Sequence, residues 1–321
     1  MKLTINQKIK VNSLKNLIIQ HPDYLHALET IEEAYLLKEQ GDLPQSFLCI
    51  GQSGTGKSTL KSTMSKLYPR KSDGEREIIP VLTLDTPSQP TIKGFAEEML
   101  IHLGDPLPHK GTQINMTNRI LKLIKSCGVK LMIFDELQHF IENRKDPSKP
   151  SDVADWFKTL IEKSKVSVVL MGLERSHQII DSNEQLRRRF SKTIDLRPFN
   201  LFDNNMRNSF LGILRKLDEE VGLPTRIDLT DKSLVKSIYF ATNGIIDYMV
   251  KLFIGAYELA LLNGEKYLSK DCFKSAFVNR IWNKGLGKLN PFEDDFVQER
   301  LDKVGMPFHL SKNAYSERIS L

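Results

Sequence analysis

The chain has 321 residues, of which 40% are hydrophobic, and carries a formal charge of +6 at pH 7. This length and composition allow one large or two moderate domains with proper cores. Apolar runs fall well short of the roughly 18 residues that predict a membrane span, and the opening stretch MKLTINQKIK lacks the apolar segment of a signal peptide. We therefore expect a cytoplasmic protein with no membrane partner.

The modest positive charge fits binding to a polyanion, but it is also common among proteins that bind none. The three cysteines, Cys49, Cys127 and Cys272, are far apart, and each lies in an apolar stretch. They lack the paired spacing of a zinc site, so we expect small, reduced core residues.

Taken in chain order, residues 1–40 are predicted to be an amphipathic helical segment, which a Gly-Asp-Leu-Pro turn separates from the first strand. Between the later strands, helical spacing indicates helices around 92–103, 120–124 and 153–161. Strands that alternate with helices predict a parallel sheet covered on both faces, hence an α/β domain. The expected strands are 47–50, 79–84, 129–134, 166–171 and 193–196.

After Pro198 only helical periodicity is found, and Asp231 and Ser269 are expected to cap two of the helices. From Gly285 the pattern weakens into a tail with isolated aromatics, which we interpret as partner-binding, with docking along its own helical domain as the alternative. The expected helices are 203–219, 231–242, 244–262 and 270–283. The expected parts are a helical segment 1–40, an α/β core 41–200, a helical domain 201–284 and a tail 285–321.

The stretch GQSGTGKS at 51–58 is a complete G-x-x-x-x-G-K-[ST] motif between a buried strand and a helix. Glycines allow backbone N–H groups to turn inward around an anion, and the helix N-terminus favours negative charge. Lys57 would reach the β- and γ-phosphates of ATP, and the Ser58 hydroxyl would ligate Mg²⁺. The alternative is a Gly-rich turn with a solvated lysine. The predicted nucleotide-binding residues are Gly51, Gln52, Ser53, Gly54, Thr55, Gly56, Lys57, Ser58 and Thr59.

The run LMIFDE at 131–136 supplies the acids that such a site needs, at the end of a buried strand. Asp135 would hold Mg²⁺ through water beside Ser58, and Glu136 would polarise the water that attacks ATP. The alternative is a strand that simply ends in a charged surface loop. Together with the phosphate loop, the two acids predict an ATPase that uses Mg²⁺.

This arrangement resembles the AAA+ ATPases, which implies a P-loop core with a parallel sheet followed by a small all-helical lid. The stretch NEQLRRRFSKTIDLRPF at 183–199 is similar to the AAA+ segment that carries the arginine finger. By that resemblance Arg189, or Arg188 as second choice, would reach the γ-phosphate held by a neighbouring subunit. The alternative is that these arginines form a solvated or DNA-facing patch.

More specifically, LDTPSQPTIKGFAEEMLIHLGD, LMIFDELQHF, VVLMGLERS and EQLRRRF resemble the TnsC/TniB family of transposon-encoded AAA+ regulators, over roughly residues 20–260. The resemblance implies an ATP-dependent homo-oligomer, as a ring or a helical filament, on double-stranded DNA of any sequence. It also implies that transposase subunits and a target-selection protein or complex are partners.

Two positions depart from the AAA+ pattern. Where a polar sensor-one residue is expected, Gly172, Leu173 and Glu174 follow the strand, leaving Glu174 or Ser176 as substitutes. Asp247 stands where the lid usually offers a sensor-two arginine. Both departures favour slow hydrolysis and a switch, in which ATP binding builds the assembly and hydrolysis takes it apart.

No motif of a known DNA-binding fold is present, so contacts with DNA would come from surface cations repeated in an oligomer. Our candidates are Lys93, Lys110 and Arg119, for which plain solvated charges are the alternative. Two other functions stay open: a replication initiator or helicase loader, for which we expect about 80 further residues of winged helix, and a nucleotide-binding adaptor with negligible turnover.

Overall fold

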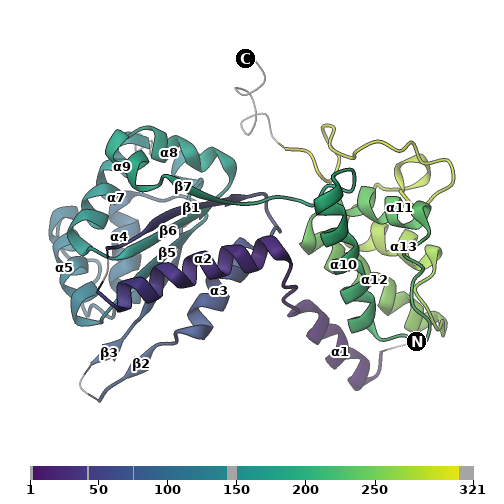
Figure 1. Ribbon diagram of the computed structural model, residues 1–321, viewed down its shortest axis with the longest axis horizontal. Coiled ribbons are helices and arrows are strands. Elements are labelled where there is room, and N and C mark those ends of the chain that lie inside the picture. The colour runs from purple at the N-terminus through teal and green to yellow at the C-terminus, as the bar shows by residue number, and fades with distance from the viewer. Residues whose placement is uncertain (1–2, 42, 75, 143–149, 311–321) are drawn as a thin grey trace. The chain divides into compact units, whose positions relative to one another are not determined.

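The structure is a computed structural model that describes residues 3–41, 43–74, 76–142 and 150–310 (Figure 1). The chain forms two compact units. The sheet unit is Asp23–Leu196, and the helical unit combines the described residues up to Pro22 with those from Arg197 onward.

Five parallel strands form the sheet in the order β4-β5-β6-β1-β7. The parallel sheet predicted from the sequence is thereby confirmed. Strand β6 lies between β1, which precedes the phosphate loop, and β5, which ends in Asp135. The strands are β1 (Ser46–Gly51), β4 (Val81–Asp85), β5 (Leu131–Asp135), β6 (Ser167–Gly172) and β7 (Lys192–Leu196).

Both faces of this sheet are buried, which explains why its strands read as continuous apolar runs. Alternate residues point to opposite faces: Leu48 and Phe134 belong to one core cluster, whereas Cys49 and Ile133 belong to the other. The first cluster includes side chains from α4, α5, α7, α8 and α9, and the second includes side chains from α2 and α3. Figure 1 labels these helices beside the sheet.

The helices of the sheet unit follow the predicted alternation. They are α2 (Pro22–Glu39), α3 (Lys57–Leu67), α4 (Ile92–His102), α5 (Gln113–Ser126), α6 (His139–Glu142), α7 (Pro150–Ser164), η1 (Glu174–Ser176), α8 (His177–Asp181) and α9 (Glu184–Arg189). A short antiparallel hairpin, β2 (Lys71–Ser72) with β3 (Glu77–Ile78), was not predicted. Its two-residue strands are too short to show a hydrophobic period.

The helical unit contains α1 (Ile5–Lys15), α10 (Asn204–Val221), α11 (Lys232–Thr242), α12 (Ile246–Asn263), α13 (Lys270–Arg280) and η2 (Gly287–Leu289). Asp231 and Ser269 are N-caps, as predicted: the Asp231 side chain accepts from two backbone N–H groups of the following turn and the Ser269 side chain from one. No helix in the described part of the chain combines the length and apolar character needed to cross a membrane.

The first 40 residues do not form one segment. Helix α1 ends at Lys15 and α2 begins at Pro22, a residue suited to the first helical turn because it lacks an N–H group. Val11 and Leu14 of α1 are buried in the core of the helical unit, whereas α2 packs in the sheet unit. The units therefore divide near Pro22 as well as after β7, which differs from the expected boundary at residue 40.

The tail packs on the helical unit as far as it is described. Phe292 and Phe308 are buried in the core of this unit, and Phe296 is half-buried against Phe240. Residues 285–310 of the tail therefore dock on their own helical unit, which was the alternative expectation. Tyr315, the fourth aromatic of the predicted partner-binding tail, lies outside the described residues.

Candidate nucleotide-binding site

The phosphate loop joins the carboxyl end of β1 to α3. Gly54 and Gly56 have φ angles of 82° and 107°, which side-chain-bearing residues rarely adopt. Gly51 is required for a different reason, because a Cβ there would lie 2.4 Å from the carbonyl oxygen of Leu196 on β7. The loop is therefore shaped both by its own backbone and by the neighbouring strand.

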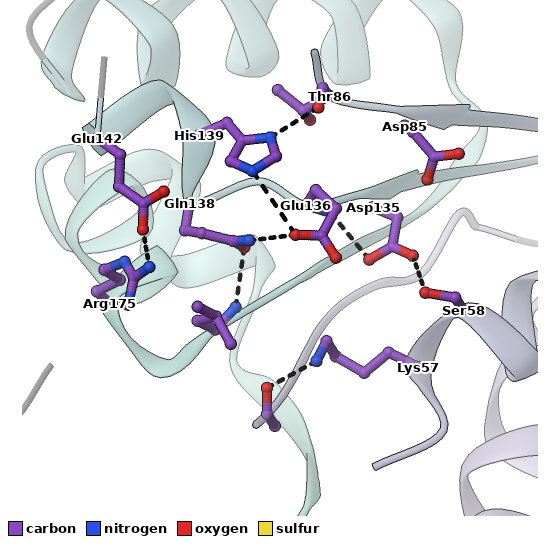
Figure 2. A network of polar contacts seen from close by, with 12 residues as sticks. Lys57, Ser58, Asp85, Thr86, Asp135, Glu136, Gln138, His139, Glu142 and Arg175 are labelled. Atoms are coloured by element: carbon purple, nitrogen blue, oxygen red, sulfur yellow. Dashed lines mark hydrogen bonds and ion pairs between the residues drawn. The ribbon is translucent and has the colours of Figure 1, made fainter. Parts of the chain in front are cut away.

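Lys57 opens α3 and is only 6% exposed. Its Nζ donates to the carbonyl oxygens of Gly51 at 2.7 Å and of Gln52 at 3.0 Å, which holds the ammonium group inside the loop. Figure 2 shows one of these two contacts. Burial lowers the pKa of Lys57, and the carboxylates of Asp135 and Glu136 oppose that shift. The cation is thus placed where phosphate charge would compensate its desolvation.

Thr55, Ser53 and Thr59 complete the predicted loop. The Thr55 hydroxyl is buried and donates to the Gln52 carbonyl at 2.8 Å, closing the turn. Ser53 is exposed, and Thr59 is half-buried in the first turn of α3.

Ser58 and Asp135 meet as expected for a magnesium site. The Ser58 Oγ donates to Oδ2 of Asp135 at 2.7 Å, and Asp135 is fully buried (Figure 2). Among the described residues no cluster of three or more His, Cys, Asp or Glu could hold a metal. One hydroxyl and one carboxylate nevertheless fit Mg²⁺, which commonly takes one or two protein ligands together with phosphate oxygens and water.

A lysine unnoticed in the sequence lies beside this pair. The Lys61 Nζ is 3.2 Å from Oδ2 of Asp135 and also pairs with Asp85 at the end of β4. Lys61 follows Lys57 by four residues, so both lie on one side of α3. Its charge compensates the buried Asp135 carboxylate in the structure described.

Glu136 follows Asp135 and has a φ angle of 59°, in the left-handed region. Its backbone N–H donates to Oδ1 of Asp135 at 2.8 Å. The Gln138 amide donates to Oε2 of Glu136, and His139 Nε2 lies 3.8 Å from the same oxygen (Figure 2). His139 Nδ1 is in turn 2.8 Å from the Thr86 carbonyl. Sequence reasoning missed Gln138 and His139, whose only signal was their place directly after the two acids.

Arg188 and Arg189 lie far from the phosphate loop of the same chain. Helix α9 precedes the amino end of β7, which pairs with the amino end of β1, whereas the phosphate loop follows the carboxyl end of β1. A six-residue strand spans about 17–20 Å. Arg189 pairs with Glu162 at 3.0 Å beside a cavity of about 600 Å³, and the exposed Arg188 pairs with Glu184 at 2.6 Å.

The three candidate DNA contacts differ in availability. Lys93 is exposed, and its Nζ is 3.8 Å from Glu97, whose other oxygen is 3.3 Å from His109, the neighbour of the exposed Lys110. Arg119 instead donates to the carbonyls of Leu107 at 2.9 Å and Lys110 at 2.7 Å. Its guanidinium braces the segment before α5, so it is less free than the two lysines.

The candidate sensor-one residues, Glu174 and Ser176, and the sensor-two position, Asp247, have the following surroundings. Ser176 is fully buried, and Glu174 is half-buried in η1. Asp247 pairs with Lys251 one turn later in α12 at 2.6 Å. Arg175, which was not predicted, pairs with Glu142, and burial lowers the pKa of its guanidinium.

The strand order, the phosphate loop and the paired acids define a AAA+ P-loop ATPase fold, as predicted. Solved structures agree. Cdc6p from Pyrobaculum aerophilum has a TM-score of 0.63 at 13% identity, with 86% of this chain and 72% of that chain covered. The Aeropyrum pernix ORC2 protein has a TM-score of 0.58 at 14% identity, with 84% and 71% covered. The Aeropyrum pernix ORC1 protein in complex with DNA has a TM-score of 0.55 at 15% identity, with 81% and 66% covered.

The family profile described as "Bacterial TniB protein" matches residues 10–200. The chain belongs to the TniB family of transposon-encoded AAA+ ATPases, as its motifs predicted. No curated protein matches the sequence.

Proposed function

We propose that this protein is an ATP-driven switch that assembles as a homo-oligomer on double-stranded DNA and links target-site selection to a transposase. The observation that carries the ATP-dependent step is the 2.7 Å contact between Ser58 and Asp135 beside the buried Lys57. Lys57 and Ser58 open α3 and Asp135 ends β5, and the juxtaposition of these residues is what an ATP–Mg²⁺ complex requires. Membership of the TniB family supports the role in transposition.

ATP would bind with its phosphates in the loop, where backbone N–H groups and Lys57 meet the negative charge. Lys57 would exchange the two neutral carbonyl oxygens of the loop for phosphate oxygens, so that its ammonium group gains a negatively charged acceptor. Ser58 and Asp135 would hold Mg²⁺, and Glu136 would polarise the attacking water.

Arg189 would serve the site of a neighbouring copy. The length of β1 keeps it from the loop of its own chain, so contact with a γ-phosphate requires a second subunit. Its partner Glu162 would release it, because an ion pair on the surface contributes little. Arg188 is the second choice, and its pair with Glu184 is more exposed.

DNA would be held by repeated weak contacts to phosphates. Lys93 and Lys110 are the better candidates, since the guanidinium of Arg119 already donates to its own chain. Each subunit would add a few contacts, and repetition makes binding strong, indifferent to sequence and sensitive to salt. The switch would be slow, because Asp247, which pairs with Lys251, stands where the usual sensor-two arginine is expected.

The test is calorimetric titration of ATP–Mg²⁺ into matched variants. Lys57→Ala should abolish binding, whereas Lys66→Ala, which removes an exposed lysine from the same helix, should leave it unchanged. Glu136→Gln should bind ATP but stall hydrolysis and hold the assembled state on DNA, measured by gel filtration and pull-down. Equal ATP affinity in the wild type and Lys57→Ala would refute the nucleotide site.

A further inference from the structure

The segment that follows β5 runs beside the end of β6, and this path positions Gln138. The Leu137 N–H donates to the Met171 carbonyl at 3.0 Å, which carries the contact between the two strands one step beyond β5. Gln138 then lies over Gly172 and is only 3% exposed. A buried amide needs partners for its donor and for its acceptor.

Both ends of the Gln138 amide are in use. Its Oε1 accepts from the Leu173 N–H at 3.0 Å, and its Nε2 donates to Oε2 of Glu136 (Figure 2). The side chain therefore links the backbone after β6 to the carboxylate after β5. Because Leu173 directly follows β6, which lies between β5 and β1 in the sheet, this link ties the Glu136 carboxylate to the sheet.

Gly172 makes room for this link. A Cβ on Gly172 would lie 2.8 Å from Oε1 of Gln138 and 2.3 Å from the hydroxyl of Ser176. The strand end where AAA+ proteins usually carry a polar side chain is thus covered by an amide from the segment that follows the neighbouring strand β5. The glycine at position 172 and the position of Gln138 therefore depend on each other, because the absent side chain of Gly172 leaves the space that the Gln138 amide occupies.

The geometry at Glu136 suits a positioned base. Within the described part of the chain, the contacts to its carboxylate from Gln138 and His139 both use Oε2. The side chain is 40% exposed. One oxygen is thereby anchored while the other faces the site, where it can accept a proton from water. The left-handed backbone conformation of Glu136 is held by hydrogen bonds on either side of it, from its own N–H to Asp135 and from the Leu137 N–H to the Met171 carbonyl.

We propose that Gln138 is a positioning residue that takes over the sensor-one role, by holding the Glu136 carboxylate in place from its anchor on the Leu173 N–H. This role rests on the proposed ATP hydrolysis. Gln138 touches neither nucleotide nor water in the proposal and acts only through Glu136. His139 Nε2 lies 3.8 Å from the same oxygen, which is beyond hydrogen-bond distance.

The experiment measures steady-state ATP hydrolysis with DNA, for Gln138→Ala and Gln138→Glu in two backgrounds. In the native background kcat should fall about ten- to a hundredfold, as expected for a displaced catalytic group, with KM changed less than about threefold. Gln138→Glu keeps the size of the side chain and the acceptor for the Leu173 N–H but loses the donor to Glu136. Its kcat should therefore fall as much as that of Gln138→Ala. In the Glu136→Gln background, Gln138→Ala should change the residual rate less than about twofold, because the group it positions is gone.

The control is Gln178→Ala, an exposed glutamine on α8, which should keep the native rate. An equal fall of kcat in both backgrounds would show a merely structural role and overturn the proposal, as would a native or increased kcat in Gln138→Ala. Hydrolysis that needs Glu136 but not Gln138 would refute only this positioning role. A wild type whose ATP turnover is absent, or independent of Glu136, would refute the proposed hydrolysis itself.

Discussion

Phe292→Ala should strongly destabilise the helical unit, which tests whether the tail is part of its core. Phe292 is 2% exposed and stacks on Phe273 with ring centroids 5.6 Å apart and an angle of 13° between the rings. The neighbouring Asn290 is 1% exposed, and its amide donates to the carbonyls of Lys274 and Gly285, both at 3.1 Å. The ring is thus held in a fixed pocket that cannot collapse easily.

Removing a fully buried phenylalanine side chain costs about 3–5 kcal/mol, because transfer energy is lost and a cavity stays behind. Phe296→Ala is the matched control, since Phe296 is in the same tail but only half-buried, at 5.5 Å from the ring of Phe240. We expect it to cost about 1 kcal/mol, in keeping with partial burial.

The assay is urea unfolding followed by tryptophan fluorescence. The chain has two tryptophans, and only Trp282 lies in the helical unit, near Phe277. A Trp156→Phe background therefore isolates the signal of this unit. A loss below about 1 kcal/mol for Phe292→Ala, or an equal loss for Phe296→Ala, would refute the inference that the tail is part of the core. Transposase pull-down with a chain ending at Leu310 would then test partner binding without disturbing these contacts.

Three further predictions concern the proposed function and the buried thiols. Mixed Arg189→Ala and Glu136→Gln subunits should recover ATPase activity that each variant lacks alone, since some interfaces then contain both intact residues; no recovery in verified mixed oligomers would argue against a shared site. Lys93→Ala and Lys110→Ala should each weaken DNA binding for all sequences and reduce the salt slope by about 1 in fluorescence anisotropy, and an unchanged slope would remove that lysine from the interface. Burial raises the pKa of the Cys49 thiol to about 12, so the thiol stays neutral at pH 8 and should react with a disulfide reagent only after unfolding; rapid labelling of the folded protein would contradict its burial.

Features encoded in short stretches could be predicted from the sequence. The phosphate loop, the two acids at the end of β5 and the N-caps Asp231 and Ser269 depend on a few adjacent residues and on local backbone chemistry. The strands were also recognisable, because a sheet buried on both faces requires continuous apolar runs. Family membership followed from the same local motifs.

Contacts between distant segments depended on the tertiary structure. No local pattern shows that Lys61 pairs with Asp135, because this contact arises only when α3 packs on β5. Nor does one show that Gln138 covers Gly172, because this contact arises only when β5 and β6 are neighbours. The same holds for α1, whose apolar face is satisfied by α10 and α12 about 200 residues later in the chain, and for the tail aromatics. The sequence shows which side chains are apolar and favour burial, but only the long-range packing determines the surface against which each of them is buried.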